Sequence, residues 1–239
     1  AIGDINGDKI DDFVVGGAKD QPTAFYIQKS DGSFYSKSFT FSKEHAKYED
    51  MDMTLEDFDN DGDNDLYIVS GGNEFEPNTP ILKDRLYIND GNGSFNYNNS
   101  SLPDNFSSGM RVSSADFDKD GDIDLFVGGR VVPGSYPLPA ESFLLENISD
   151  ANGIKFKNTD ESIFSFKEIG LVTSSVWTDY NNDGWEDLVV VGEWTPIKFY
   201  KNMEGKFSED TSLIDIDSTR GWWYDVISED FDNDGDMDL

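Results

Sequence analysis

The sequence predicts an all-β fold, a β-propeller of four-stranded blades, and three observations lead to it. One acidic nonapeptide occurs five times in the 239 residues. Each copy is followed by the same order of short apolar runs, separated by turns rich in Gly, Asn and Asp. A helical pattern is visible only at residues 42–48. Units of roughly 50–60 residues with four strands each are typical of propellers, whose sheets pack radially around an axis.

The strands of each unit follow from their apolar runs and turn residues. The acidic nonapeptide leads into an apolar strand, a variable loop follows, and two further strands flank a turn that contains glycine. A last strand leads into the next nonapeptide. The apolar strands after the nonapeptides are expected at residues 13–17, 66–69, 125–129 and 188–192, and the strands that lead into the next nonapeptide at 51–55, 110–114, 173–177 and 223–227. The hairpin signatures, two strands around a turn, run from 25–27 to 32–34, from 86–88 to 93–95, from 143–145 to 153–156 and from 199–200 to 205–207.

The same repeat sets the domain organisation. We expect one partial propeller over residues 1–239, with units at 1–50, 51–108, 109–170 and 171–220 and a truncated unit at 221–239. An array of β-sandwiches is the alternative. A sandwich array does not require an acidic loop at one fixed point of every unit, so the propeller is favoured.

The five acidic nonapeptides predict cation sites. Positions 1, 3, 5 and 9 are Asp or Asn in every copy, and clustered carboxylates repel one another unless a cation lies among them. Calcium prefers such oxygen ligands, and the varied position 7 suits a backbone carbonyl. Positions 1, 3, 5, 7 and 9 are Asp4, Asn6, Asp8, Ile10 and Asp12; Asp57, Asp59, Asp61, Asp63 and Asp65; Asp116, Asp118, Asp120, Asp122 and Asp124; Asp179, Asn181, Asp183, Trp185 and Asp187; and Asp230, Asp232, Asp234, Asp236 and Asp238.

Up to five structural Ca²⁺ ions are therefore expected. Lys9 replaces the glycine that follows position 5 in the other copies, which puts only the first site in question. An EF-hand loop needs a glutamate at position 12 and flanking helices. Position 12 here is Val15, Ile68, Val127 or Val190, inside β-like runs, so an EF-hand is not expected.

Composition narrows the class of protein. The chain has 49 acidic and 18 basic residues, a net charge of -31, yet 14% of its residues are aromatic, which argues against a disordered acidic tail. So acidic a surface disfavours nucleic acid and anionic membranes as partners, and no membrane-inserting segment is visible. Cysteine is absent, so neither disulfides nor thiolate metal sites are expected. Calcium loops fill readily where calcium is millimolar, which predicts a secreted or cell-surface protein.

The loop pattern, Asp-x-Asp/Asn-x-Asp-Gly-x-x-Asp before an apolar strand, resembles the FG-GAP/VCBS repeat of integrin α-chain propellers and many bacterial surface proteins. The resemblance implies a ring of about seven blades, of which this chain is a fragment, with calcium between the first and second strands of a blade. Residues 128–137 and 221–223 are similar more narrowly to bacterial relatives of cartilage acidic protein, of the ASPIC/UnbV type. That similarity implies association with the bacterial outer membrane and an outer-membrane complex as a possible partner.

Strand alternation predicts where a ligand binds. If every metal loop joins strands one and two, the loops after strand two lie on the opposite face. That face should gather aromatic and arginine side chains, which are typical of protein interfaces and sugar sites. We expect this face to bind a protein or a glycan, so that the chain serves as an adhesion or assembly module. Packing between blades is an alternative role for Trp222 and Trp223. The candidate ligand-binding residues are Arg130, Tyr136, Trp194, Trp222 and Trp223.

The sequence offers little for catalysis, and no enzyme activity is expected. His45 is the single histidine, which excludes a multi-histidine metal site. Glu74 with Glu76, or Glu44 with Glu49, could form a carboxylate pair, but such pairs arise by chance in so acidic a chain, and a solvated acidic face is the favoured interpretation. The alternative function is the propeller part of a carbohydrate-active enzyme such as a polysaccharide lyase.

Overall fold

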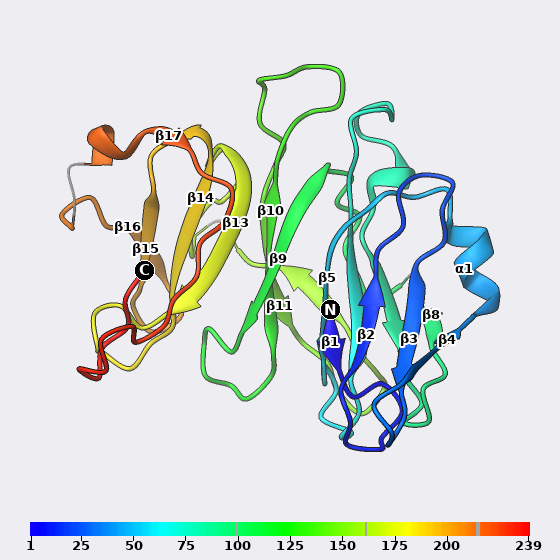
Figure 1. The fold of residues 1–239 in the computed structure, drawn as a ribbon. Helices are drawn as coiled ribbons and strands as arrows, with labels where there is room; N and C mark the ends of the chain where they lie inside the picture. The colour runs from blue at the N-terminus through cyan, green and yellow to red at the C-terminus, as the bar shows by residue number, and fades with distance from the viewer. Residues whose placement is uncertain (99, 161, 214–215) are drawn as a thin grey trace.

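The computed structural model describes residues 1–239 except 99, 161 and 214–215 (Figure 1). It contains four antiparallel sheets, each with its strands in sequence order, so the predicted four-stranded blades are confirmed. Blade 1 holds β1 (Ile2–Gly3), β2 (Asp12–Val15), β3 (Ala24–Gln28) and β4 (Phe34–Lys37); blade 2 holds β5 (Asp50–Glu56), β6 (Asp65–Ser70), β7 (Arg85–Ile88) and β8 (Asn96–Asn98); blade 3 holds β9 (Gly109–Ala115), β10 (Asp124–Gly129), β11 (Phe143–Asn147) and β12 (Phe156–Asn158); blade 4 holds β13 (Leu171–Thr178), β14 (Asp187–Thr195), β15 (Lys198–Asn202) and β16 (Phe207–Glu209).

The second strand of a blade shows why the chain folds this way. In β6 and β10 every residue is buried, because neighbouring blades cover both faces of the strand. Their apolar runs are accordingly continuous rather than alternating. The fourth strands are only three or four residues long, and β8 is largely exposed, which leaves only brief edges to solvent.

The core lies between blades rather than inside them. Three clusters of buried apolar side chains join blade 1 to blade 2, blade 2 to blade 3, and blade 3 to blade 4. Phe58 shows the principle: it belongs to a metal loop of blade 2, is 0% exposed, and meets Phe156 of blade 3 edge-on at 5.2 Å between ring centroids. Burial of this kind supplies most of the stability of such a repeat fold.

Helical structure is confined to connections. Helix α1 (Thr40–His45) forms where a helical turn is expected, in the segment between blades 1 and 2. The 3₁₀ turns η1 (Pro80–Leu82) and η2 (Ile216–Thr219) lie in later connections. None of the helices in the described part of the chain is long and apolar enough to cross a membrane.

The strand expected at residues 223–227 is not formed, and this prediction was wrong. Instead β17 (Gly221–Trp222) pairs with the end of β14, opposite Glu193 and Thr195. The residues after β17 reach blade 4 through side chains, since Ser174 donates to Asp225 at 2.6 Å and Thr173 donates to the carbonyl of Trp223 at 2.6 Å. A strand needs a hydrogen-bonded neighbour along its length. After β17, the described backbone pairing of this unit is a single isolated bridge between Glu229 and Asp238.

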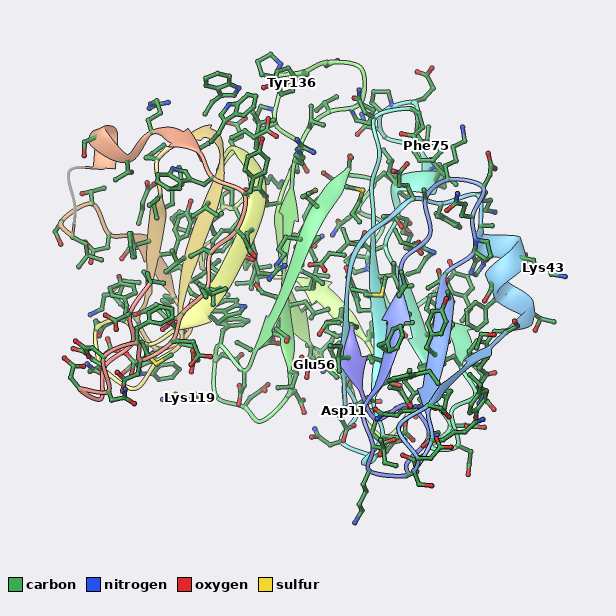
Figure 2. The ribbon with its side chains drawn as sticks, viewed as in Figure 1. Asp11, Lys43, Glu56, Phe75, Lys119 and Tyr136 are labelled. Carbon is green, nitrogen blue, oxygen red and sulfur yellow. The ribbon has the colours of Figure 1, made fainter. Side chains whose placement is uncertain are left out.

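The two faces of the assembly differ as predicted. The loops between first and second strands share one face, where Asp11, Glu56 and Lys119 are labelled in Figure 2. The loops after the second strands lie on the other face, where Phe75 and Tyr136 are labelled. The acidic loops and the loop that carries Tyr136 thus lie on opposite faces of the assembly.

Candidate metal loops and aromatic face

The five acidic nonapeptides, called loops 1 to 5 in chain order, share one backbone shape. In each loop, positions 4 and 6 have positive φ, a region that glycine and asparagine enter most easily. Loop 1 keeps this shape with Lys9 at position 6, where φ is +67°. The pairs of φ values are Gly7 77° and Lys9 67°, Asn60 58° and Gly62 96°, Lys119 62° and Gly121 98°, Asn182 56° and Gly184 87°, and Asn233 61° and Gly235 94°.

The aspartate at position 1 organises each loop. In loop 3, Asp116 accepts the backbone N–H groups of Asp120 and Gly121 through its two oxygens, both at 3.1 Å. Loop 1 repeats these contacts, because Asp4 accepts the N–H groups of Asp8 at 3.2 Å and Lys9 at 2.7 Å. Lys9 therefore leaves the loop frame intact, although a lysine in a left-handed conformation is strained.

The aspartate at position 9 is the buried member of the set. Asp124 is 1% exposed, and it accepts the N–H groups of Phe117 at 3.2 Å and Asn147 at 2.7 Å. Burial raises the pKa of Asp124 to about 8 and that of Asp65 to about 7, despite these hydrogen bonds. Burial likewise raises the pKa of Asp187 to about 6. A carboxylate held in this way is favourable only when it is protonated or close to a cation.

The donor set fits a hard divalent cation. In loop 2, Asp59 Oδ1 and Asp63 Oδ1 are buried without any hydrogen-bond partner. Each of three loops brings three aspartate oxygens within 4.8 Å of one another. All of these donors are oxygens, the atoms that calcium prefers, and no softer ligand is present. The three groups are Asp57, Asp59 and Asp61; Asp116, Asp118 and Asp124; and Asp230, Asp232 and Asp234.

A recurrent asparagine joins loops 1, 2 and 3 to the blade that follows each of them, and sequence reasoning missed it. Asn147, at the end of β11, is 1% exposed and donates to the carbonyls of Phe58 at 2.9 Å and Ile123 at 3.2 Å. Phe58 belongs to loop 2 and Ile123 to loop 3, so one amide connects two blades. Asn89 and Asn202 make the equivalent contacts in blades 2 and 4. The feature that could have revealed it in the sequence is an asparagine at the end of the third strand of blades 2, 3 and 4 or directly after it.

On the opposite face, three exposed aromatic side chains converge. Trp194 Nε1 donates to Tyr136 Oη at 2.6 Å, and Trp222 meets Trp194 edge-on with ring centroids 5.0 Å apart at 78°. Each of the three side chains is about half exposed, at 51–53%. Arg220 donates to the Trp194 carbonyl at 3.1 Å. We call Tyr136, Trp194 and Trp222 the aromatic corner.

The backbone of Trp194 is strained in order to present this ring. Its φ is +59°, in the left-handed region, at an irregularity where β17 pairs with β14. The neighbouring Glu193 is buried and forms an ion pair with Arg130. Arg130 thereby braces the base of the corner rather than presenting a free charge. Strain of this kind at an exposed aromatic residue is a feature that functional sites often retain.

Trp223, the fifth candidate, lies apart from the aromatic corner. Its Nε1 donates to the Thr219 carbonyl at 2.8 Å, and its ring lines an apolar groove with Phe199 and Phe231. Trp222 thus joins the aromatic corner, whereas Trp223 packs along the side of blade 4. Adjacent residues in an extended segment point to opposite sides, which separates the two rings.

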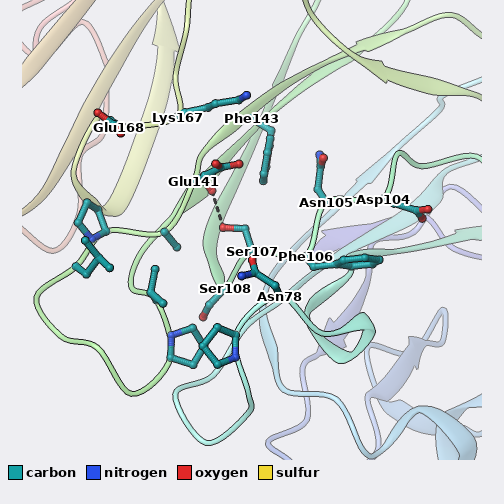
Figure 3. A pocket seen from close by; sticks show the side chains of 16 residues that line it. Asn78, Asp104, Asn105, Phe106, Ser107, Ser108, Glu141, Phe143, Lys167 and Glu168 are labelled. Carbon is teal, nitrogen blue, oxygen red and sulfur yellow. Dashed lines mark hydrogen bonds between the residues drawn. The ribbon is translucent and has the colours of Figure 1, made fainter.

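The face that carries the aromatic corner also has a pocket, which lies between blades 2 and 3. A pocket of about 410 Å³ is formed by the connections around residues 77–78, 104–108, 132–141 and 167–168. Figure 3 shows Phe106, Phe143 and the polar side chains of Asn78, Glu141 and Lys167 around one space. The loop that carries Tyr136 also lines this pocket, through Val132, Pro133 and Leu138. Both features therefore belong to one continuous surface of variable loops.

The structure pairs different glutamates from those considered in the sequence. Glu49 is hydrogen-bonded to Glu74, and this contact together with burial raises the pKa of Glu49 to about 7. Each pair proposed from sequence contained one of these two residues with the wrong partner. His45 is buried, and its Nδ1 lies 2.8 Å from Tyr87 Oη, so it packs in the blade 2 interface.

Comparison with known proteins gives a family and a structural likeness. The sequence matches the family described as FG-GAP-like repeat over residues 4–68, 57–127 and 179–239. No curated protein matches the chain. It is similar to a solved structure described as "Structure of Dos1 propeller", with a TM-score of 0.40 and 11% sequence identity. That similarity covers 88% of this chain and 61% of the other chain.

Proposed function

Because this chain belongs to the FG-GAP-like repeat family, we propose that it is a calcium-stabilised, extracellular propeller that binds a glycan through its aromatic corner. The metal loops and the corner lie on opposite faces, so calcium would act on the fold and not on the ligand. The exposed, strained Trp194 is the observation that carries the proposal.

The calcium part of the proposal is supported by the charges of the loops. Bound calcium would supply positive charge to carboxylates that the fold holds close together. In loop 2, Asp57, Asp59, Asp61 and Asp65 are its side-chain ligands, and the carbonyl of Asp63 is the expected backbone ligand. Asp65 and Asp124 would then bind the cation in their charged form, which burial otherwise disfavours. Metal binding would thereby contribute directly to folding.

Chelation tests this part. Removal of calcium with excess chelator should lower the melting temperature by several degrees or more, and calcium but not sodium should restore it. Asp124→Asn should lower the melting temperature in calcium and reduce the effect of the chelator, because loop 3 loses a charged ligand. An unchanged melting curve in protein verified to be metal-free would refute calcium stabilisation.

The glycan part is supported by the shape of the aromatic corner. Two indole rings at 78° form two walls, and the apolar face of a pyranose ring packs well against such rings. Arg220, beside Trp194, can donate to sugar hydroxyl or carboxylate groups. The converging rings line a small apolar hollow bordered by Arg220, which suits the alternating apolar and hydroxyl-bearing faces of a sugar chain.

Binding to a panel of neutral and acidic polysaccharides tests the corner. Trp194→Ala should weaken binding to the best polysaccharide at least about tenfold, the usual size for a central aromatic contact. Tyr35→Ala is the matched control, because Tyr35 is 45% exposed on blade 1, away from the corner. If no polysaccharide binds, or if both variants bind like the parent, a glycan ligand is refuted and a protein partner becomes the better hypothesis.

One observation favours a second candidate, a carbohydrate-active enzyme such as a polysaccharide lyase. The pair of Glu49 and Glu74 could hold or release a proton near neutral pH, as acid–base catalysis requires. Release of unsaturated sugars from acidic polysaccharides, lost in Glu74→Gln, would support a lyase. Binding without any product would favour the binding module.

A further inference from the structure

Loop 4 differs from loops 2 and 3 in its own side chains. Loops 2 and 3 have aspartate at all five alternating positions, whereas loop 4 has Asn181 at position 3 and Trp185 at position 7. Asn181 donates its amide to Asp187 Oδ2 at 2.6 Å. The equivalent oxygen of Asp124 accepts a backbone N–H instead. The buried aspartate of loop 4 therefore has a neutral side chain as its partner, within the loop itself.

Loop 4 also has a cation of its own. Lys201, on β15, places Nζ 3.1 Å from Asp183 Oδ2, so its ammonium forms an ion pair with a side chain of the loop. The residue in the same place is Ile88 in blade 2 and Glu146 in blade 3. Blade 4 thus places a lysine beside its loop, whereas blade 3 places Glu146, which is ion-paired with Lys157 at 2.8 Å.

A second lysine reaches loop 4 from the neighbouring blade. Lys119, at position 4 of loop 3, donates to the carbonyl of Gly184. Its ammonium also lies 4.3 Å from the centre of the Trp185 ring. In the equivalent contact between loops 2 and 3, Asn60 donates a neutral amide to Asp122 at 2.9 Å. Loop 4 thus receives a lysine from its own blade and another from loop 3, whereas loop 3 receives only a neutral amide from loop 2.

We propose that Lys201, with Lys119 and Asn181, compensates the charge of loop 4, which makes loop 4 the weakest divalent-cation site among loops 2, 3 and 4. The inference rests on the proposed calcium binding of the loops. A divalent cation must compete with the Lys201 ammonium for Asp183, whereas no such competitor contacts the carboxylates of loop 2 in the described contacts. Blade 4, which carries Trp194, would then keep its loop structure without calcium, while loops 2 and 3 depend on the ion.

Terbium luminescence can follow loop 4 separately, because Trp185 is the one tryptophan within the five loops. An indole close to bound Tb³⁺ sensitises its emission, so Trp185→Phe should abolish the signal that arises from loop 4. Titration of Tb³⁺ and displacement by Ca²⁺ then give the affinity of this loop. Calorimetry with Ca²⁺ gives the total number of sites and their affinities.

The decisive variant is Lys201→Met, and the matched control is Lys206→Met. Lys206 is an exposed lysine of the same hairpin, so both variants lose one positive charge. Lys201→Met should raise the affinity at the Trp185-sensitised site about three- to tenfold, the effect of removing one adjacent charge at a partly exposed site. Lys206→Met should leave that affinity unchanged. Calcium should displace terbium from loop 4 more readily than from the other loops.

Three results would overturn the inference. Equal affinities in the parent and Lys201→Met would show that Lys201 does not compete. Equal gains in both lysine variants would show an effect of net charge alone. Loop 4 filling before the other sites would reverse the proposed order. Absence of any calcium binding by calorimetry, with no effect of chelator on melting, is a different result that refutes the proposed function itself and the inference with it.

Discussion

Replacing Asn147 by alanine should destabilise the junction between blades 2 and 3. The amide of Asn147 donates to the carbonyls of Phe58 and Ile123, and its oxygen accepts the N–H of Ser149 at 3.0 Å. Each buried polar group left without a partner costs about 1–3 kcal/mol. Two carbonyls are affected, but the contact to Ile123 is only partly buried, so we expect a loss of about 2–4 kcal/mol in the free energy of unfolding.

Urea unfolding followed by tryptophan fluorescence, at saturating calcium, measures this loss. Asn152→Ala is the control: Asn152 lies in an exposed turn of the same blade, and its removal should change stability by less than about 0.5 kcal/mol. Asn147→Asp should be worse than alanine at neutral pH, because it places a negative charge against two carbonyl oxygens. If alanine at Asn147 and at Asn89 both cost less than about 0.5 kcal/mol, the asparagines do not hold the blades together.

Three further predictions concern other parts of the fold. Lys9→Gly should stabilise the protein by about 0.5–1 kcal/mol in thermal or urea unfolding, since glycine adopts the +67° φ of this position without strain; a loss of stability would contradict the assigned loop shape. Phe58→Ala should cost about 3–5 kcal/mol, whereas Phe231→Ala, at the same loop position but 59% exposed, should cost less than about 1 kcal/mol; similar losses would refute the role of inter-blade burial. Asp84 has its pKa raised to about 6 by burial, above the unfolded value of about 3.9, so its contribution to stability is present at low pH and is lost as pH rises through 6. The stability difference between the parent and Asp84→Asn should therefore shrink between pH 4 and pH 7, by at most about 1.4 kcal/mol per pH unit, and a constant difference would refute the assignment.

The repeat, the strands and the separation of the two faces were predictable because they depend on local chemistry. The acidic spacing of loop 2, the apolar run after Asp65 and the glycine turns each act within a few residues. Strand alternation then places the loops without any knowledge of contacts between blades. The strand expected at residues 223–227 was wrong because the local pattern is present, but no neighbouring strand in the described part of the chain pairs with this segment. Such pairing does not follow from local chemistry.

Contacts between distant residues could only be seen in the tertiary structure. Asn147 reaches Phe58 across 89 positions of sequence, and Glu49 meets Glu74 because a variable loop folds back over the end of blade 2. Trp222 and Trp223 are adjacent in sequence, yet only the first joins Tyr136 and Trp194. The sequence by itself determined the oxygen-rich loops and their spacing, because each loop is a local structure. The tertiary structure decided which charges surround each loop and which aromatic rings converge, because both depend on how neighbouring blades pack.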